Sequence, residues 1–159
     1  MKNIRIFFNE SELFNLRNIK PLNGITGLYF IFLTKLSIQY PFKKSRLIYI
    51  GMSEKRTNSI GLRLTDHYEG KSGNVGISSY KSRDTLKFTY INFEMLKNIW
   101  PCRIEDLESY FILDFVNNYG VYPICNNKTG FEILHSKIDT KFKIDWRYFE
   151  KGSSWKNWN

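Results

Sequence analysis

The chain of 159 residues has little cysteine, little histidine and no long apolar run. Its two cysteines are too few for the disulfide framework of a small secreted domain, and neither has a histidine at zinc-site spacing, so buried free thiols are expected. The longest apolar stretch, residues 25–33, is far shorter than the ~20 residues of a membrane-spanning helix. Polar residues 9–12 interrupt the apolar start of the chain. The sequence therefore predicts no signal peptide, no membrane association and a cytoplasmic location.

Acidic side chains are scarce in the first part of the chain. Residues 1–60 carry ten Lys or Arg and three Asp or Glu, whereas residues 101–159 carry eight of each kind. The whole chain has 24 basic and 15 acidic residues and a net charge of +9. This excess favours a polyanionic partner that meets the N-terminal part.

The apolar content is that of a folded protein. Apolar residues make up 42% of the chain and aromatic residues 17%, which excludes a solvated, disordered segment. The length allows one domain with a real core and is too short for two domains of ordinary size. A single domain over residues 1–159 is therefore predicted.

Short strands and a few helices are predicted from the hydrophobic pattern. The apolar side chains of residues 10–19 suggest a short helix. Residues 27–33 and 47–50 are rich in β-branched and aromatic residues, which predicts two strands paired as an antiparallel hairpin, and residues 86–93 alternate as a third strand. Apolar periodicity predicts a helix over residues 59–68.

The last part of the chain begins with a second predicted helix. It runs over residues 101–118, with Pro101 at its start and Gly120 just past its end, as the helix start and stop rules require. Glycines between these two helices, at positions 70, 73 and 76, predict a loop. The tryptophan-rich residues 146–159 suggest either a packed tail or a nucleic-acid contact, with packing favoured.

One carboxylate occupies an unusual place in the predicted helix 101–118. With about 100° of rotation per residue, four apolar side chains project within about 60° of Glu108. They are Ile104, Phe111, Ile112 and Phe115. Burial of an unpaired carboxylate is costly, so Glu108 is expected to have a metal ion, a basic partner or a raised pKa. A salt bridge to an arginine on another element is the purely structural interpretation.

Arg63 and His67 form a second pair of interest. They are four residues apart, so they project from one face of the predicted helix, one turn from each other. This placement suits a cation that grips a phosphate while an imidazole stays within reach. By itself the spacing is common on surface helices and would carry no functional conclusion.

Four short motifs follow one another along the chain: Gly27-Leu28-Tyr29, Tyr49-Ile50-Gly51, Arg63-x-x-x-His67 and Glu108 in a later helix. In this order and at these spacings they resemble the GIY-YIG nuclease family. The resemblance covers residues 25–127. It implies an α/β fold with a small, mainly antiparallel three-stranded sheet flanked by helices, an N-terminal extension over residues 1–24 and a C-terminal extension over residues 128–159.

The resemblance also implies a reaction, the hydrolysis of a phosphodiester bond with Mg²⁺ or Mn²⁺. Glu108 would hold the metal ion, and Arg63 would neutralise the scissile phosphate. The hydroxyls of Tyr29 and Tyr49 would point into the cleft. Either His67 or Tyr29 would take the proton from water, and in a third arrangement His67 orients Tyr29.

The supporting residues implied by the resemblance are two glycines and an asparagine. Gly27 and Gly51 would belong to the core of the site, and Asn126, or else its neighbour Asn127, would close it. The loop between the two tyrosine strands is longer than is usual in the family. Basic side chains in this loop and just after the second strand are expected to contact DNA phosphates. They are Lys43, Lys44, Arg46, Lys55 and Arg56.

The resemblance therefore predicts a metal-dependent DNA endonuclease. The leading expectation is a type II restriction-like enzyme that cuts duplex DNA, as a homodimer. A phage or mobile-element nuclease that nicks DNA or recognises its structure is the first alternative. A catalytically inactive nucleic-acid-binding module is the second.

Overall fold

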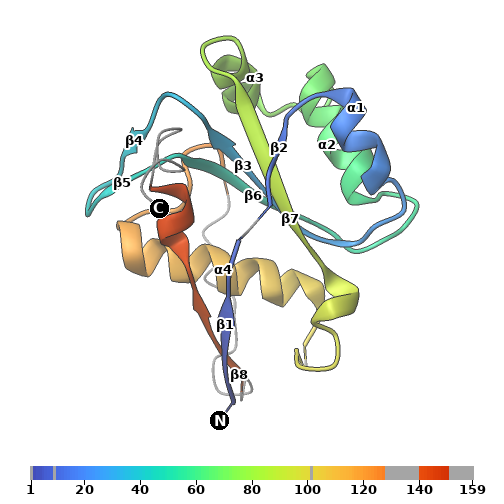
Figure 1. Cartoon of the computed structure of the whole chain (residues 1–159), viewed down its shortest axis with the longest axis vertical. Coiled ribbons are helices and arrows are strands. Elements are labelled where there is room, and N and C mark those ends of the chain that lie inside the picture. The colour runs from blue at the N-terminus through green and yellow to red at the C-terminus, as the bar shows by residue number, and fades with distance from the viewer. Residues whose placement is uncertain (1, 9, 101, 128–139, 151–159) are drawn as a thin grey trace.

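The computed structural model describes residues 2–8, 10–100, 102–127 and 140–150, and it shows a mixed α/β fold (Figure 1). Its main sheet is antiparallel and has the strand order β2-β7-β3-β6. These strands are β2 Glu12–Leu13, β7 Leu86–Asn92, β3 Gly27–Leu33 and β6 Leu47–Ser53. The sheet therefore has four strands and not the predicted three.

The additional strand replaces part of the helix predicted over residues 10–19. Glu12 and Leu13 pair with β7, and only α1 (Leu16–Ile19) is helical. The side chain of Asn15 accepts a hydrogen bond from the backbone N–H of Asn18 at 2.9 Å, which caps α1 at its N-terminus. The cap fixes the helix start after the strand, so the prediction for residues 10–15 is wrong.

The predicted hairpin is confirmed. Strand β3 pairs with β6 on one side and with β7 on the other, and Tyr29 lies opposite Gly51 and Tyr90. Two minor strands, β4 (Ile38–Gln39) and β5 (Lys44–Ser45), pair within the long connection between β3 and β6.

Alternate side chains of β3 enter two separate hydrophobic clusters, one on each face of the sheet. Leu28, Phe30 and Phe32 pack toward α4 (Ile104–Tyr119). Tyr29, Ile31 and Leu33 pack toward α1, α2 (Ile60–Glu69) and α3 (Val75–Lys81). Every residue of β3 is consequently buried, which explains its continuous apolar sequence.

The helices after β6 agree with the predictions except at two places, α3 and the start of α4. Helix α2 begins after Ser59, whose side chain caps it, and ends at Gly70 in a left-handed conformation. Helix α3 lies where only a loop was predicted, since the side chain of Asn74 caps it by accepting from Ile77 N–H at 3.1 Å. Helix α4 begins at Ile104, and Pro101 lies outside the described residues, but Gly120 ends the helix as predicted. Among the described residues no helix is long and apolar enough to cross a membrane.

Two segments far apart in the sequence pair as a parallel ribbon that the sequence did not reveal. Strand β1 (Lys2–Ile6) pairs with β8 (Thr140–Ile144), and the short helix η4 (Trp146–Phe149) follows. Side chains of the ribbon and of η4 join the cluster beneath α4. Trp146 is buried there, so the packing predicted for it is confirmed, while residues 151–159 lie outside the described part. Two single turns, η1 (Lys20–Leu22) and η2 (Phe93–Met95), complete the fold.

Candidate active site

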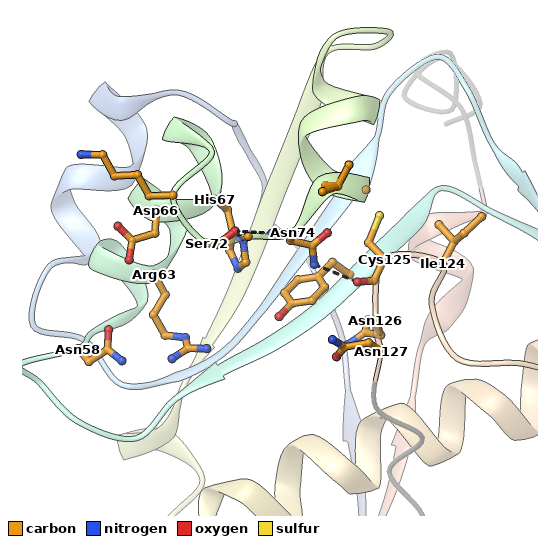
Figure 2. A pocket seen from close by; sticks show the side chains of 15 residues that line it. Asn58, Arg63, Asp66, His67, Ser72, Asn74, Ile124, Cys125, Asn126 and Asn127 are labelled. Atoms are coloured by element: carbon orange, nitrogen blue, oxygen red, sulfur yellow. Dashed lines mark hydrogen bonds between the residues drawn. The ribbon is translucent and has the colours of Figure 1, made fainter.

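A pocket of about 680 Å³ lies beside β6, between α2 and the segment of residues 124–127 (Figure 2). Three of the predicted catalytic residues, Tyr49, Arg63 and His67, line it. Most of its other lining side chains are polar: Asn58, Asp66, Lys71, Ser72, Asn74, Asn126 and Asn127. Tyr29 is fully buried behind this lining, with an exposed fraction of 0%.

A chain of hydrogen bonds connects the buried tyrosine to the loop after α2. The Tyr29 hydroxyl lies 3.0 Å from His67 Nε2, and His67 Nδ1 lies 2.8 Å from Ser72 Oγ. Ser72 Oγ also accepts from the backbone N–H of Asn74 at 3.2 Å. On the other side, Arg63 Nε donates to the Tyr29 hydroxyl at 3.5 Å. Both ring nitrogens of His67 are therefore engaged.

The protons of this chain can be arranged in two directions. In one, Tyr29 O–H donates to Nε2, and Nδ1–H donates to Ser72. In the other, Nε2–H donates to Tyr29, and Ser72 O–H donates to Nδ1. Both arrangements keep the two contacts of His67, so one proton can pass along the chain without breaking them.

The electrostatics of the site keep His67 neutral. Burial, and to a lesser extent the charge of Arg63, lower the pKa of His67 to about 4, while Asp66 opposes this shift. At neutral pH the imidazole is therefore an uncharged base with one unprotonated nitrogen. A buried neutral histidine has a nitrogen free to accept a proton, although the lowered pKa makes it a weak base, and without charge it is poorly suited to pair with a phosphate.

The hydroxyls and the guanidinium next to His67 are also perturbed. Burial raises the pKa of Tyr29 and of Tyr49 above the usual value, and the negative charge of Glu108 raises both further. Burial alone would lower the pKa of Arg63, but the two tyrosines and Glu108 together raise it. Glu108 is half-buried on α4 and does not line the pocket, yet its charge acts on Tyr29, Tyr49 and Arg63.

Two glycines make room for this arrangement. A Cβ on Gly51 would lie 2.3 Å from Tyr29 Cζ, because the tyrosine ring crosses directly over the neighbouring strand. A Cβ on Gly27 would lie 1.9 Å from the carbonyl oxygen of Ile91, and its φ of +151° is rare for other residues. Glycine is thus required at both positions for physical reasons.

The segment after α4 is fastened to β6 by an asparagine. Asn126 Oδ1 accepts from Ile50 N–H at 2.9 Å, and Asn126 Nδ2 donates to the Ile50 carbonyl at 2.8 Å. Cys125 N–H donates to the carbonyl of Ile48 at 2.8 Å. Both candidate asparagines line the pocket, but Asn126 makes the supporting contact, while Asn127 is exposed.

The residues predicted to bind DNA are dispersed. Lys55 and Arg56 are exposed in the turn that leads to Asn58 of the pocket, and Lys44 is exposed on β5. Lys43 forms an ion pair with Glu150 at 3.0 Å. None of the five residues lines the pocket.

Arg46 requires a correction. Its guanidinium donates to the carbonyls of Leu33 and Tyr148 at 3.1 and 3.0 Å and lies 5.3 Å from the ring centre of Phe32. With 8% of its surface exposed, it joins the sheet to η4 and does not present its charge to a phosphate. The basic residues of the loop could not by themselves reveal that Arg46 is buried, because its burial depends on segments far away in the sequence.

Sequence reasoning missed Ser72, Asn74 and Lys71, which line the pocket from the loop after α2. Ser72 holds His67, and the Asn74 side chain donates to the Cys125 carbonyl at 3.0 Å. The only available signal was that the loop follows His67 directly and contains Gly70 and Gly73, which have positive φ.

The donor set limits the kind of metal site. Within the described residues, no group of three or more His, Cys, Asp or Glu side chains could hold a metal ion. Mg²⁺, however, commonly binds one or two carboxylates and completes its shell with water and substrate phosphates. A site with Glu108 as its one protein carboxylate would fit that pattern. The described residues would not fit a metal ion that is enclosed by several protein ligands.

Comparisons with family models, with curated proteins and with solved structures found no match for this chain.

Proposed function

We propose that the protein is a metal-dependent nuclease that hydrolyses phosphodiester bonds of DNA. The observation that carries this proposal is the Tyr29–His67 pair, held beneath Tyr49 and Arg63 within the electrostatic influence of Glu108. Phosphodiester hydrolysis needs a proton acceptor, a cation for the phosphate oxygens and an acidic metal ligand. These residues could supply all three.

Arg63 is the group that would neutralise the scissile phosphate. It is half-buried, lines the pocket and has its Nε directed to the Tyr29 hydroxyl. Arginine suits this role because it stays charged and offers several donors in a fixed plane. The Tyr49 hydroxyl and Lys71 would contact the same strand of DNA from the pocket wall.

His67 would act through Tyr29. Because Nε2 and Nδ1 are both engaged, water cannot reach the imidazole without displacing Tyr29 or Ser72. In the proposed reaction the lining side chains move to admit a water to the buried Tyr29 hydroxyl, which accepts a proton from it as its own proton passes to Nε2. His67 is then a positioning residue and the final proton acceptor, which combines roles that the sequence offered as alternatives.

Glu108 would hold Mg²⁺ or Mn²⁺, and the bound ion would neutralise charge on the phosphate and help the leaving oxygen. The finer features of the proposal rest on the GIY-YIG resemblance and on the net charge. They are duplex DNA as substrate, restriction-like cleavage, a homodimer and a cytoplasmic location.

The experiment that tests the proposal is cleavage of supercoiled plasmid DNA with Mg²⁺, with Mn²⁺ and with EDTA. The wild-type protein should nick or linearise the plasmid only when a divalent ion is present. Glu108→Gln should retain its circular dichroism spectrum and its DNA binding but lose cleavage by at least about a hundredfold, the scale of a lost charge-stabilising group.

Glu105→Gln is the matched control on the same helix turn. Glu105 is partly exposed and pairs with Arg103 at 3.1 Å, so its loss should leave cleavage unchanged. If Glu108→Gln cuts DNA at the wild-type rate, the metal assignment is wrong. If the wild type cuts neither duplex nor single-stranded DNA with either ion, the nuclease proposal fails.

A further inference from the structure

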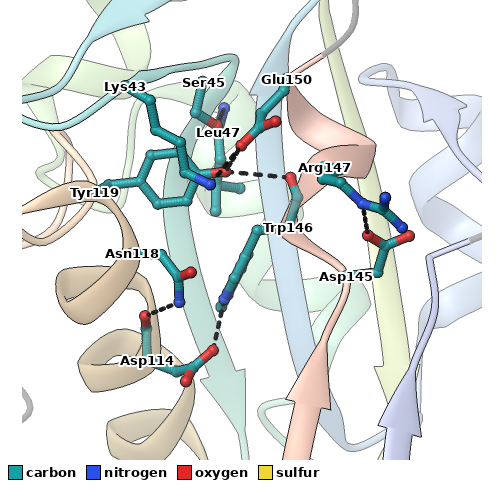
Figure 3. Close-up of polar contacts among 10 residues, drawn as sticks. All are labelled: Lys43, Ser45, Leu47, Asp114, Asn118, Tyr119, Asp145, Trp146, Arg147 and Glu150. Atoms are coloured by element: carbon teal, nitrogen blue, oxygen red, sulfur yellow. Dashed lines mark hydrogen bonds and ion pairs between the residues drawn. The ribbon is translucent and has the colours of Figure 1, made fainter.

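A second pocket, of about 390 Å³, lies beside the β1–β8 ribbon and shares no lining residue with the candidate active site. The ribbon, the end of α4 and the start of η4 form its walls (Figure 3). Four basic side chains and a single carboxylate line it: Arg5, Lys43, Lys143, Arg147 and Asp145.

The ribbon register produces the central pair of this basic cluster. Arg5 on β1 lies directly opposite Lys143 on β8, and both are exposed, whereas Ile6 and Ile144 beside them are buried. Neighbouring strands lie about 4.8 Å apart, so the two cationic side chains start from adjacent points. Residues from opposite ends of the sequence thus concentrate positive charge on one outer face.

The cations differ in how far they are already neutralised. Lys43 pairs with Glu150, and Arg147 Nε pairs with Asp145 Oδ1, each at 3.0 Å (Figure 3). In the described part of the chain, Arg5 and Lys143 form no ion pair. Because these two positive charges lie side by side and neither is paired with a carboxylate, they favour binding of an anion.

The wall of the pocket is fixed. Trp146 Nε1 donates to Asp114 Oδ2 at 2.7 Å, and the Tyr119 hydroxyl donates to Glu150 Oε1 at 2.6 Å. These contacts join η4 to α4. They also hold Glu150, the partner of Lys43, and the neighbourhood of Asp145, the partner of Arg147. Phe7, at the mouth, keeps 61% of its surface exposed. An exposed ring beside cations suits a nucleotide better than a free phosphate ion.

We infer that this pocket is a second binding site for the phosphate backbone of a nucleic-acid strand, with Arg5 and Lys143 as its principal contacts. The basic pocket itself is independent of the nuclease proposal, but the choice of nucleic acid as ligand rests on it. The site replaces the buried Arg46 as a phosphate contact outside the active site, and it includes Lys43 of the same loop.

The test is the salt dependence of DNA binding by the double variant Arg5→Ala/Lys143→Ala. Anisotropy of a fluorescent duplex is measured over a range of NaCl concentrations in EDTA, where the proposed cleavage does not occur. Each phosphate contact contributes about 0.9 to the slope of log K against log salt, so this slope should become shallower by about 2. Affinity should also fall.

Arg17→Ala/Lys20→Ala is the matched control, because it removes two exposed cations from α1 and η1, outside both pockets. The inference is overturned if the ribbon variant keeps the wild-type slope, if both variants lower it equally, or if the wild type binds no DNA. Binding with the expected slope change, but no cleavage of duplex or single-stranded DNA with Mg²⁺ or Mn²⁺, would support this site and refute the nuclease proposal.

Discussion

The two faces of the main sheet are built from different chemistry, although β3 supplies side chains to both. On the α4 face, Phe30 packs against the rings of Phe8, Phe111 and Phe149 at centroid distances of 4.8, 5.8 and 6.1 Å. On the α2 face, Tyr29 meets His67 through a hydrogen bond. At β3 itself, Phe30 is held by non-directional ring packing, whereas Tyr29 is held also by directional hydrogen bonds.

This difference predicts a division of roles. Burial of rings contributes stability in proportion to the apolar area removed from water. A buried hydroxyl and imidazole contribute little net stability but fix each other's position. The α4 face should therefore carry the stability of the fold, and the α2 face the geometry of the proposed chemistry.

The largest expected effect comes from the neighbours Phe30 and Tyr29. Phe30→Ala should lower the free energy of unfolding by about 3–5 kcal/mol, because it removes a fully buried ring. Tyr29→Phe keeps its ring and should lower the free energy of unfolding by only about 1 kcal/mol, while cleavage falls at least about a hundredfold. Urea unfolding and plasmid cleavage measure the two effects. Equal destabilisation by both variants would remove the distinction between the faces.

Gly51→Ala should disturb the α2 face by steric contact. The new methyl group would meet the Tyr29 ring, which His67 and Arg63 hold in place, so about 1–3 kcal/mol of unfolding free energy should be lost. In a Tyr29→Ala background the same change should cost much less. A double-mutant cycle from urea unfolding gives the coupling energy, and a coupling near zero would show that the ring is not the obstacle.

The pH dependence of stability should show the buried neutral imidazole. The pKa of His67 is about 4 in the folded chain and 6.5 when unperturbed, so the unfolded chain binds a proton first as pH falls. Stability present above pH 6.5 is then lost toward pH 4, by about 2 kcal/mol between pH 7.5 and pH 5. His67→Gln should lack this part of the loss. If both proteins lose the same unfolding free energy, His67 does not titrate as the structure indicates.

Ser72→Ala should have the smallest effect on stability, less than about 1 kcal/mol, because Ser72 is exposed. It should nevertheless change the tautomer balance of His67, observed by ¹⁵N NMR of the imidazole, and slow cleavage by about tenfold. Ser72→Thr keeps the hydroxyl and should restore both properties. Ser78→Ala, an exposed serine of α3, is the control; an unchanged tautomer in Ser72→Ala would refute the positioning role.

Local signals account for the parts of the fold that could be predicted. The strands over residues 27–33 and 86–92 and the stop at Gly120 follow from side-chain pattern and from conformational preference over a few neighbouring residues. Strand β2 and helix α3 could not be predicted in the same way. They depend on a partner strand and on single caps at Asn15 and Asn74, which compete with weak local propensity.

The sequence by itself determined the order of the motifs, the helical spacing of Arg63 and His67, and the excess of positive charge. Only the tertiary structure decided which of these groups meet. It joined Tyr29 to His67 and His67 to Ser72, buried Arg46, and paired Arg5 with Lys143. The physical reason is that hydrogen bonding and burial depend on distances between residues far apart in the chain, which periodicity and composition do not encode.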